Sequence, residues 1–161
     1  DREAFVAALG GIFEHSPWVA ARAFGARPFD SVDALHAAMV GAMRAAARDE
    51  QLALIRAHPE LAGRAALRRE LTADSANEQS GAGLTQCSPE ELARLVDLNA
   101  RYRAKFGFPF VLAVKGRDRA GVIAELARRL ERDPATEFAE ALEQIARIAA
   151  LRLADRLPDG A

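Results

Sequence analysis

Apolar residues recur every three or four positions along most of this chain, which is the spacing of one face of an α-helix. One helix is expected to begin after Ser31, a residue type that caps helix N-termini. Its apolar face would consist of Leu35, Met39 and Met43. Asp49 is expected to cap the next helix. That helix must end near His58, because Pro59 disfavours helical backbone in the residue before it.

Two further helices have clear start signals. Ser88, Pro89 and Glu91 combine a capping hydroxyl, a proline in the first turn and a glutamate three residues after the cap. This helix is expected to end around Phe106-Gly107, because glycine commonly follows the last helical residue. Asp133-Pro134 is expected to begin a long final helix. The apolar face of that helix would carry Phe138, Leu142, Ile145, Ile148 and Leu151.

One segment breaks the helical pattern. Residues 108–114 follow Gly107, contain a proline and are rich in apolar and β-branched side chains. We expect an extended buried segment or one short strand here, and no sheet, because no second strand candidate lies nearby. The predicted fold class is therefore all-α: a single-domain bundle of seven to nine helices over residues 1–161, with one short extended segment near 108–114.

The composition fits one globular domain. The chain has 161 residues, of which 50% are hydrophobic, and its formal net charge is -1. This balance does not favour a nucleic-acid partner. No apolar run approaches the ~20 residues that cross a bilayer, so we expect no membrane partner either. Cys87 is the only cysteine, which excludes an internal disulfide and favours a reducing, cytoplasmic location.

Two short polar islands interrupt the amphipathic pattern. His58 lies where Pro59 breaks a helix, and Glu78-Gln79 lie in a second polar stretch further along the chain. An imidazole can move a proton near neutral pH, and a carboxylate can orient it or bind a substrate N–H group. The alternatives are a capping or solvent-exposed histidine and a solvated helix face. Gly81 and Gly83 lie beside this stretch, but no lysine of the kind found in phosphate-binding loops accompanies them. The glycines therefore do not indicate a nucleotide site.

Arg152 is the third candidate, on the face of the final helix that is expected to pack inward. An unpaired buried cation is costly. Either the side chain runs along the helix to solvent, or its guanidinium binds an anionic ligand. His15 is expected to have a structural role at a helix end, and His36 is expected to lie on the surface or in helix packing. No metal site is expected, because no two histidines have a spacing typical of metal ligands.

A set of short tracts spread over nearly the whole chain forms a specific combination. The tracts are Ile12-Phe-Glu-His-Ser-Pro-Trp18, His58-Pro-Glu-Leu-Ala62, Ser75-Ala-Asn-Glu-Gln79 with Ala82-Gly-Leu84, Leu98-Asn99 with Tyr102, Lys105-Phe-Gly-Phe-Pro-Phe-Val111, and Ile148-Ala-Ala-Leu-Arg-Leu153. Each tract alone is unspecific, whereas their order and spacing are specific. Together they resemble the family of 2-oxo-4-hydroxy-4-carboxy-5-ureidoimidazoline (OHCU) decarboxylases.

The resemblance implies an activity and a site. It implies decarboxylation of OHCU to (S)-allantoin on an all-helical fold, without a cofactor or metal, and it suggests a homodimer. The catalytic residues that it implies are His58, Glu78 and Arg152. The substrate-binding residues that it implies are Pro59, Ser75, Gln79, Phe110, Val111, Leu112, Ala113 and Val114.

Two other functions remain open at this point. A non-catalytic helical interaction module would share the helix pattern, and its sign would be a large exposed apolar patch. A different lyase or hydrolase acting on a ureide intermediate could use the same polar residues. The favoured hypothesis is a cofactor-independent decarboxylase of urate degradation, with His58 in proton transfer.

Overall fold

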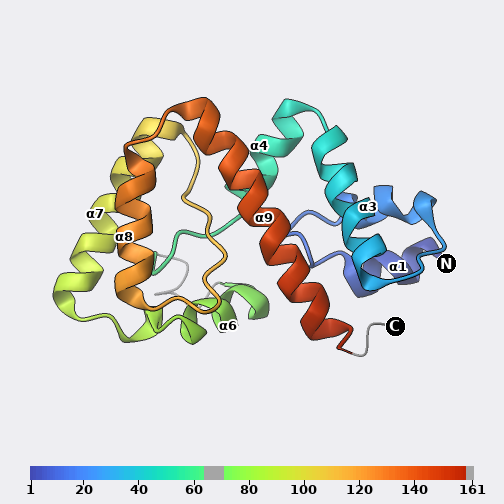
Figure 1. Ribbon diagram of the computed structural model, residues 1–161, viewed down its shortest axis with the longest axis horizontal. Helices are drawn as coiled ribbons and strands as arrows, with labels where there is room; N and C mark the ends of the chain where they lie inside the picture. The colour runs from blue at the N-terminus through green and yellow to red at the C-terminus, as the bar shows by residue number, and fades with distance from the viewer. Residues whose placement is uncertain (64–70, 159–161) are drawn as a thin grey trace. The chain divides into compact units, whose positions relative to one another are not determined.

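The computed structural model describes residues 1–63 and 71–158 (Figure 1). Within these ranges the chain forms eight α-helices and two short 3₁₀ helices, and it forms no strand. The α-helices are α1 (Arg2–Leu9), α2 (Trp18–Ala23), α3 (Val32–Ala45), α4 (Arg48–Arg56), α6 (Ala73–Gly81), α7 (Pro89–Phe106), α8 (Arg119–Leu130) and α9 (Pro134–Arg156), and the 3₁₀ helices are η1 (Phe24–Ala26) and η2 (Leu84–Gln86). The predicted all-α class is confirmed for the described residues.

The chain forms two compact units, described separately below. The terminal unit comprises Asp1–His58 together with Leu142–Ala161, and the middle unit comprises Pro59–Ala141. Helix α9 runs without a break (Figure 1). Its first two turns belong to the middle unit, and the rest of the helix belongs to the terminal unit. The prediction of a single domain over residues 1–161 stays a prediction.

The terminal unit confirms the helix predicted after Ser31. The Ser31 hydroxyl accepts a hydrogen bond from the N–H group of Ala34 at 3.0 Å, which caps α3. The predicted apolar face is buried: Leu35, Met39 and Met43. Nε2 of His36 lies 2.8 Å from the carbonyl oxygen of Ala146 on α9, so His36 has the packing role expected of it.

The predicted cap of the next helix is wrong. Helix α4 begins at Arg48, with Ala47 as its N-cap, so Asp49 lies inside the first turn. Ala47 has no capping side chain, but Glu50 reaches back and accepts from the Ala47 N–H group at 3.2 Å. This second half of a capping box is sufficient to start the helix. The helix ends at Arg56, just before His58-Pro59, as predicted.

The middle unit shows the predicted start and end of α7. The Ser88 hydroxyl accepts from the Glu91 N–H group at 3.1 Å, and the Glu91 carboxylate accepts from the Ser88 N–H group at 2.9 Å. Gly107 ends the helix with φ at 79°, a left-handed conformation that suits glycine. Helices α7 and α8 lie side by side in this unit (Figure 1). At the start of α9, the Asp133 carboxylate accepts from the Thr136 N–H group at 2.9 Å, as the Asp133-Pro134 signal predicts.

Residues 108–114 are neither helix nor strand. All of its residues except Ala113 are buried: Phe108, Pro109, Phe110, Val111, Leu112 and Val114. Aromatic rings surround the start of the segment, since Tyr102 contacts Phe108 and Phe110 edge-on at 6.0 and 5.5 Å between ring centroids. Of the two alternatives for this segment, the buried non-strand conformation is therefore the one observed.

The reciprocal cap of α7 leads to a stability prediction. Replacing Ser88 with Ala removes the acceptor for the Glu91 N–H group, and loss of such a cap costs about 1 kcal/mol of unfolding free energy. Urea denaturation of Ser88→Ala should show this loss. Ser80→Ala is the matched control, because Ser80 is exposed on α6 and should leave the midpoint unchanged. Equal midpoints for the two variants would contradict the role of Ser88.

Candidate functional site

The candidate residues divide between the two units. His58 and Arg152 belong to the terminal unit, whereas Pro59, Ser75, Glu78, Gln79 and residues 110–114 belong to the middle unit. Each group is therefore described within its own unit. The predicted meeting of the His58, Glu78 and Arg152 side chains stays a prediction.

The His58 imidazole is buried and held in one orientation. His58 is 7% exposed, and its Nδ1 lies 3.0 Å from the carbonyl oxygen of Leu54, one turn earlier on α4. A carbonyl oxygen can only accept, so Nδ1 carries the proton in this hydrogen bond. Nε2 of the neutral ring then presents a lone pair. Pro59 disfavours helical backbone at His58, and His58 lies just after the end of α4.

The surroundings of His58 favour its uncharged form. Burial lowers the pKa of the imidazole from about 6.5 to about 4. The hydrogen bond to Leu54 and the negative charge of Glu14 raise the pKa, while the positive charges of Arg152 and His15 lower it, and burial outweighs them all. At neutral pH, the folded protein therefore holds the His58 imidazole uncharged.

Arg152 is paired within the protein. Arg152 and Glu14 are 3% and 1% exposed, and Nη2 of Arg152 lies 3.2 Å from Oε2 of Glu14. Nη1 donates to the carbonyl oxygens of Gly11 and Ile12, both at 3.4 Å. The alternative in which this side chain runs to solvent is wrong, because a buried carboxylate and two carbonyls hold the guanidinium inside.

Glu14 is the residue that the sequence analysis missed. It lies in the tract around Trp18 but was given no role of its own. Its neighbour His15 has a left-handed backbone with φ at 47° and is exposed, whereas Glu14 and Ser16 on either side are buried. Ser16 does not cap α2: its hydroxyl donates to the Glu14 carbonyl at 2.9 Å, and Pro17 is the N-cap of α2.

In the middle unit, two amide side chains hold the turn that follows Pro59. The Ala62 N–H group donates to Oε1 of Gln79 at 2.9 Å. The side-chain amide of Asn99 on α7 donates to the Leu61 carbonyl, also at 2.9 Å. Ala62 has φ at 53°, a conformation that L-residues adopt only when their surroundings enforce it. The turn after His58-Pro59 is thus fixed by residues from α6 and α7.

In each of these two side-chain amides, the second polar atom has no hydrogen-bond partner among the described residues. These atoms, Nε2 of Gln79 and Oδ1 of Asn99, are buried. Buried polar groups are almost always satisfied, so such exceptions need an explanation, and a bound ligand or an ordered water is the usual one. One donor and one acceptor on amides that hold consecutive residues suit a ligand with an amide or urea group.

Helix α6 carries three of the candidates. Ser75 and Gln79 are buried, four residues apart and therefore on one face of the helix, and Glu78 is half-buried beside them. Thr72 caps this helix, since its hydroxyl accepts from the Ser75 N–H group at 3.2 Å. The cap fixes where the face carrying Ser75 and Gln79 begins.

The buried 110–114 segment also contains polar groups without partners. The Val111 carbonyl accepts from Nη1 of Arg129 at 2.7 Å. In the described part of the chain, no hydrogen bond is made by the peptide N–H groups of Phe110, Val111 and Leu112 or by the carbonyls of Phe110 and Leu112. Such groups are available to a ligand that replaces water.

Other kinds of site find less support in the described residues. In residues 1–63 and 71–158, no three His, Cys, Asp or Glu side chains gather as metal ligands would. None of the described helices combines the length and hydropathy of a membrane-spanning helix. Two surface depressions of the terminal unit, about 480 and 400 Å³ in volume, are not lined by any candidate residue.

Comparison with known proteins places these features in a family. The family model described as OHCU decarboxylase matches residues 1–154. The chain belongs to the OHCU decarboxylase family. A relative from Haloferax volcanii, named 2-oxo-4-hydroxy-4-carboxy-5-ureidoimidazoline decarboxylase, is 46% identical over 156 residues, which are 97% of this chain and 90% of the Haloferax protein. A human protein named as a putative enzyme of the same activity is 45% identical over 153 residues, covering 95% of this chain and 88% of the human protein.

A solved structure agrees with the fold. The crystal structure of an (S)-allantoin synthase matches 97% of this chain and 50% of its own chain, with a TM-score of 0.75 and 31% sequence identity. The resemblance found in the sequence tracts is therefore confirmed, as is the predicted enzyme class, a carboxy-lyase. The expectation of a non-catalytic interaction module is correspondingly disfavoured.

The buried His58 leads to a prediction about stability and pH. The folded-state pKa of about 4 lies below the ordinary value of 6.5, so the unfolded chain binds a proton at this position that the folded protein does not. Stability should therefore fall as the pH is lowered from about 6.5 to about 4, by about 3 kcal/mol from this residue.

The measurement compares the wild type with His58→Asn. Urea unfolding free energies are measured for both from pH 4 to pH 8, and the difference between the two isolates residue 58 from the other titrating groups. The wild type should lose stability relative to the variant as the pH falls. Parallel curves of unfolding free energy against pH would show that His58 has the same pKa in the folded and unfolded states.

Proposed function

We propose that this protein converts OHCU to (S)-allantoin and carbon dioxide without a cofactor, and that His58 moves the proton. Family membership supports the reaction. The observation that carries the role of His58 is its buried, uncharged imidazole, with Nδ1 bound to the Leu54 carbonyl and the Nε2 lone pair available.

The substrate supplies the electron sink that decarboxylation needs. When the bond to the carboxylate breaks, its electron pair remains on the ring carbon that also bears the hydroxyl group. The neighbouring ring carbon, which bears the ureido group, is part of a C=N bond. The electron pair can form a C=C bond with that carbon while the C=N electrons move to nitrogen. No cofactor chemistry is then required, and the protein supplies position, charge and a proton path.

Three proton movements complete the reaction. The hydroxyl group loses its proton as its carbon becomes a carbonyl, and the ureido-bearing carbon gains a proton on one face. The ring nitrogen that received the C=N electrons gains a proton that comes from water. His58 is available to take the hydroxyl proton on Nε2, because the free enzyme holds its imidazole uncharged. The resulting imidazolium can deliver a proton to the ureido-bearing carbon. Transfer from a fixed ring would set the (S) configuration.

The charges beside His58 fit this cycle. While the ring is neutral, the Glu14 carboxylate compensates the Arg152 guanidinium. When the ring takes up a proton, Glu14 stabilises the positive charge, as the direction of its influence on the pKa of His58 shows. We propose that Arg152 holds an anionic or carbonyl oxygen of the substrate.

The middle unit supplies the proposed substrate contacts. The buried Nε2 of Gln79 is a hydrogen-bond donor without a partner among the described residues, and Ser75 lies on the same face of α6. Glu78 would bind ureido N–H groups or orient His58, and Pro59 would contact the ring. The peptide groups of Phe110, Val111, Leu112, Ala113 and Val114 would satisfy the ring amides, as a buried polar ligand requires.

The setting of the enzyme is proposed on less specific grounds. A cytoplasmic location fits a chain with a single cysteine, and the family resemblance supports a homodimer. The formal net charge of -1 offers nothing to a nucleic acid or an anionic membrane. Sedimentation velocity of the purified protein would test the homodimer.

The role of His58 is tested by turnover and by product chirality. Freshly generated OHCU is mixed with protein, and circular dichroism follows the allantoin formed, since spontaneous decay of OHCU gives racemic product. The wild type should yield (S)-allantoin. His58→Asn should lower kcat by about 10²–10⁴-fold, because it removes the general acid–base group, and the remaining product should approach the racemate.

The matched control is His36→Asn, the same change at a histidine that binds a backbone carbonyl on α9. It should turn over at the wild-type rate. Full turnover and full (S) excess in a folded His58→Asn variant would remove His58 from the mechanism. Racemic product at the background rate from the wild type would instead favour the non-catalytic interaction module.

A further inference from the structure

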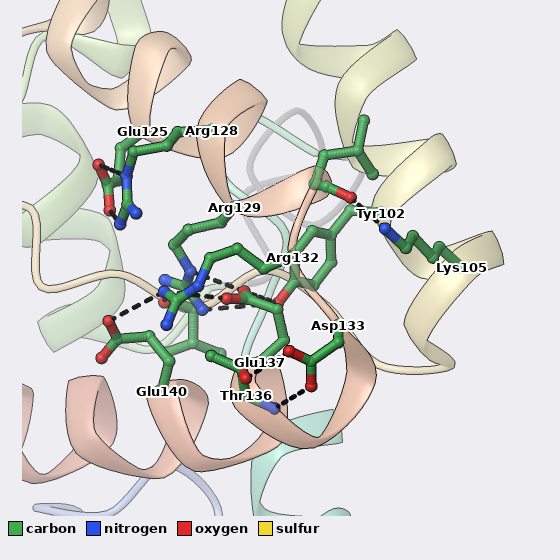
Figure 2. Close-up of polar contacts among 12 residues, drawn as sticks. Tyr102, Lys105, Glu125, Arg128, Arg129, Arg132, Asp133, Thr136, Glu137 and Glu140 are labelled. Atoms are coloured by element: carbon green, nitrogen blue, oxygen red, sulfur yellow. Dashed lines mark hydrogen bonds and ion pairs between the residues drawn. The ribbon is translucent and has the colours of Figure 1, made fainter.

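The bulkiest side chain that is completely buried in the described part of the chain is a cation. Arg129 on α8 is 0% exposed, and so are Glu137 on α9 and Tyr102 on α7. All three belong to the middle unit. Figure 2 shows their polar ends meeting at one point from the three helices. None of the three has a role in the function proposed above.

Glu137 is the centre of this buried cluster. Its Oε1 accepts from Nε of Arg129 at 2.7 Å and from the Tyr102 hydroxyl at 2.6 Å. Its Oε2 lies 3.2 Å from Nη1 of Arg132, which is less buried (Figure 2). Burial and the bond to Glu137 raise the pKa of the Tyr102 phenol, so this hydroxyl keeps its proton and donates. The Arg129 guanidinium is therefore clamped from one side.

The other side of the guanidinium reaches the extended segment. Nη1 of Arg129 donates to the Val111 carbonyl at 2.7 Å. The guanidinium carbon lies 4.5 Å from the centre of the Phe110 ring, in cation–π contact. One cation thus fixes both the side chain of residue 110 and the carbonyl of residue 111. No helix or strand does this for the segment, because it belongs to neither.

Stability alone does not account for a buried ion pair. Replacing such a pair by apolar side chains of similar volume is often neutral or stabilising, because desolvation of two charges offsets their attraction. Apolar side chains would pack α7, α8 and α9 equally well, but they could not donate to the Val111 carbonyl. The planar guanidinium can bind a carboxylate and a carbonyl at the same time.

We propose that Arg129, clamped by Glu137 and Tyr102, is a positioning residue for the decarboxylation. It holds the Val111 carbonyl and the Phe110 ring so that the unpaired peptide groups of residues 110–112 are set to bind the substrate ring. Arg129 acts through this segment and does not touch the substrate. The inference rests on the proposed function, because it takes the 110–114 segment as part of the substrate site.

The test removes the cluster without leaving a buried charge behind. The triple variant Arg129→Met/Glu137→Leu/Tyr102→Phe replaces all three polar ends, so its melting temperature should stay near that of the wild type. Its KM for OHCU should rise about tenfold, and its affinity for (S)-allantoin should fall by a similar factor, as expected for the loss of one or two hydrogen bonds. Its kcat should change much less.

Two further variants sharpen the test. Arg129→Lys keeps the charge but cannot reach carboxylate and carbonyl together, so it should show the same rise in KM. Arg128→Met/Glu125→Leu is the control, because this neighbouring pair is on α8 as well but its arginine side chain is 56% exposed (Figure 2). The control should keep the KM, the affinity for (S)-allantoin and the melting temperature of the wild type.

The outcomes separate this inference from the proposed function. A folded triple variant with the KM and the (S)-allantoin affinity of the wild type would show that the cluster serves stability only. If the triple variant does not fold, the KM and the (S)-allantoin affinity of Arg129→Lys decide the question, measured below the melting temperature of Arg129→Lys. A wild type that forms no excess of (S)-allantoin would remove the proposed function and this inference together. An active wild type with an unaffected variant would remove the inference alone.

Discussion

A charge that is taken out of water must be paired, and each unit of this protein buries an arginine–glutamate pair. In the terminal unit, Arg152 and Glu14 face one another beside His58. In the middle unit, Arg129 and Glu137 lie 2.7 Å apart and support residues 110 and 111. Such pairs add little stability over apolar packing. What they do provide is a fixed field and fixed donors next to the segments to which the chemistry is assigned.

The polar groups that stay unsatisfied within the described residues are informative for the same reason. The Gln79 amide nitrogen and the Asn99 amide oxygen are buried without partners, on amides that enforce the left-handed turn at Ala62. The peptide groups of residues 110–112, apart from the Val111 carbonyl that Arg129 holds, are a second such set. Their chemistry, alternating donors and acceptors, matches a heterocycle with amide and ureido groups.

Local rules in the sequence predicted what depends on a few neighbouring residues. The caps at Ser31 and Ser88 and the end of α7 at Gly107 are of this kind. The helix cap predicted at Asp49 is wrong, because the Glu50 carboxylate accepts a hydrogen bond from the Ala47 N–H group and α4 begins earlier. The partners of His58 and Arg152 could not be predicted, because Glu14 is 138 positions from Arg152 and no sequence period connects them. The roles of Arg129 and Glu137 likewise depend on three helices meeting. The order of the short tracts along the chain indicated the family. The spacing between single residues could not predict the contacts of these buried charged residues.

The central claim is that the folded protein holds His58 uncharged, with the proton on Nδ1. Nitrogen-15 NMR of the imidazole as a function of pH tests this directly. We expect the Nδ1–H tautomer at neutral pH and a midpoint of protonation at about 4. A midpoint near 6.5, or a neutral ring with its proton on Nε2, would contradict it.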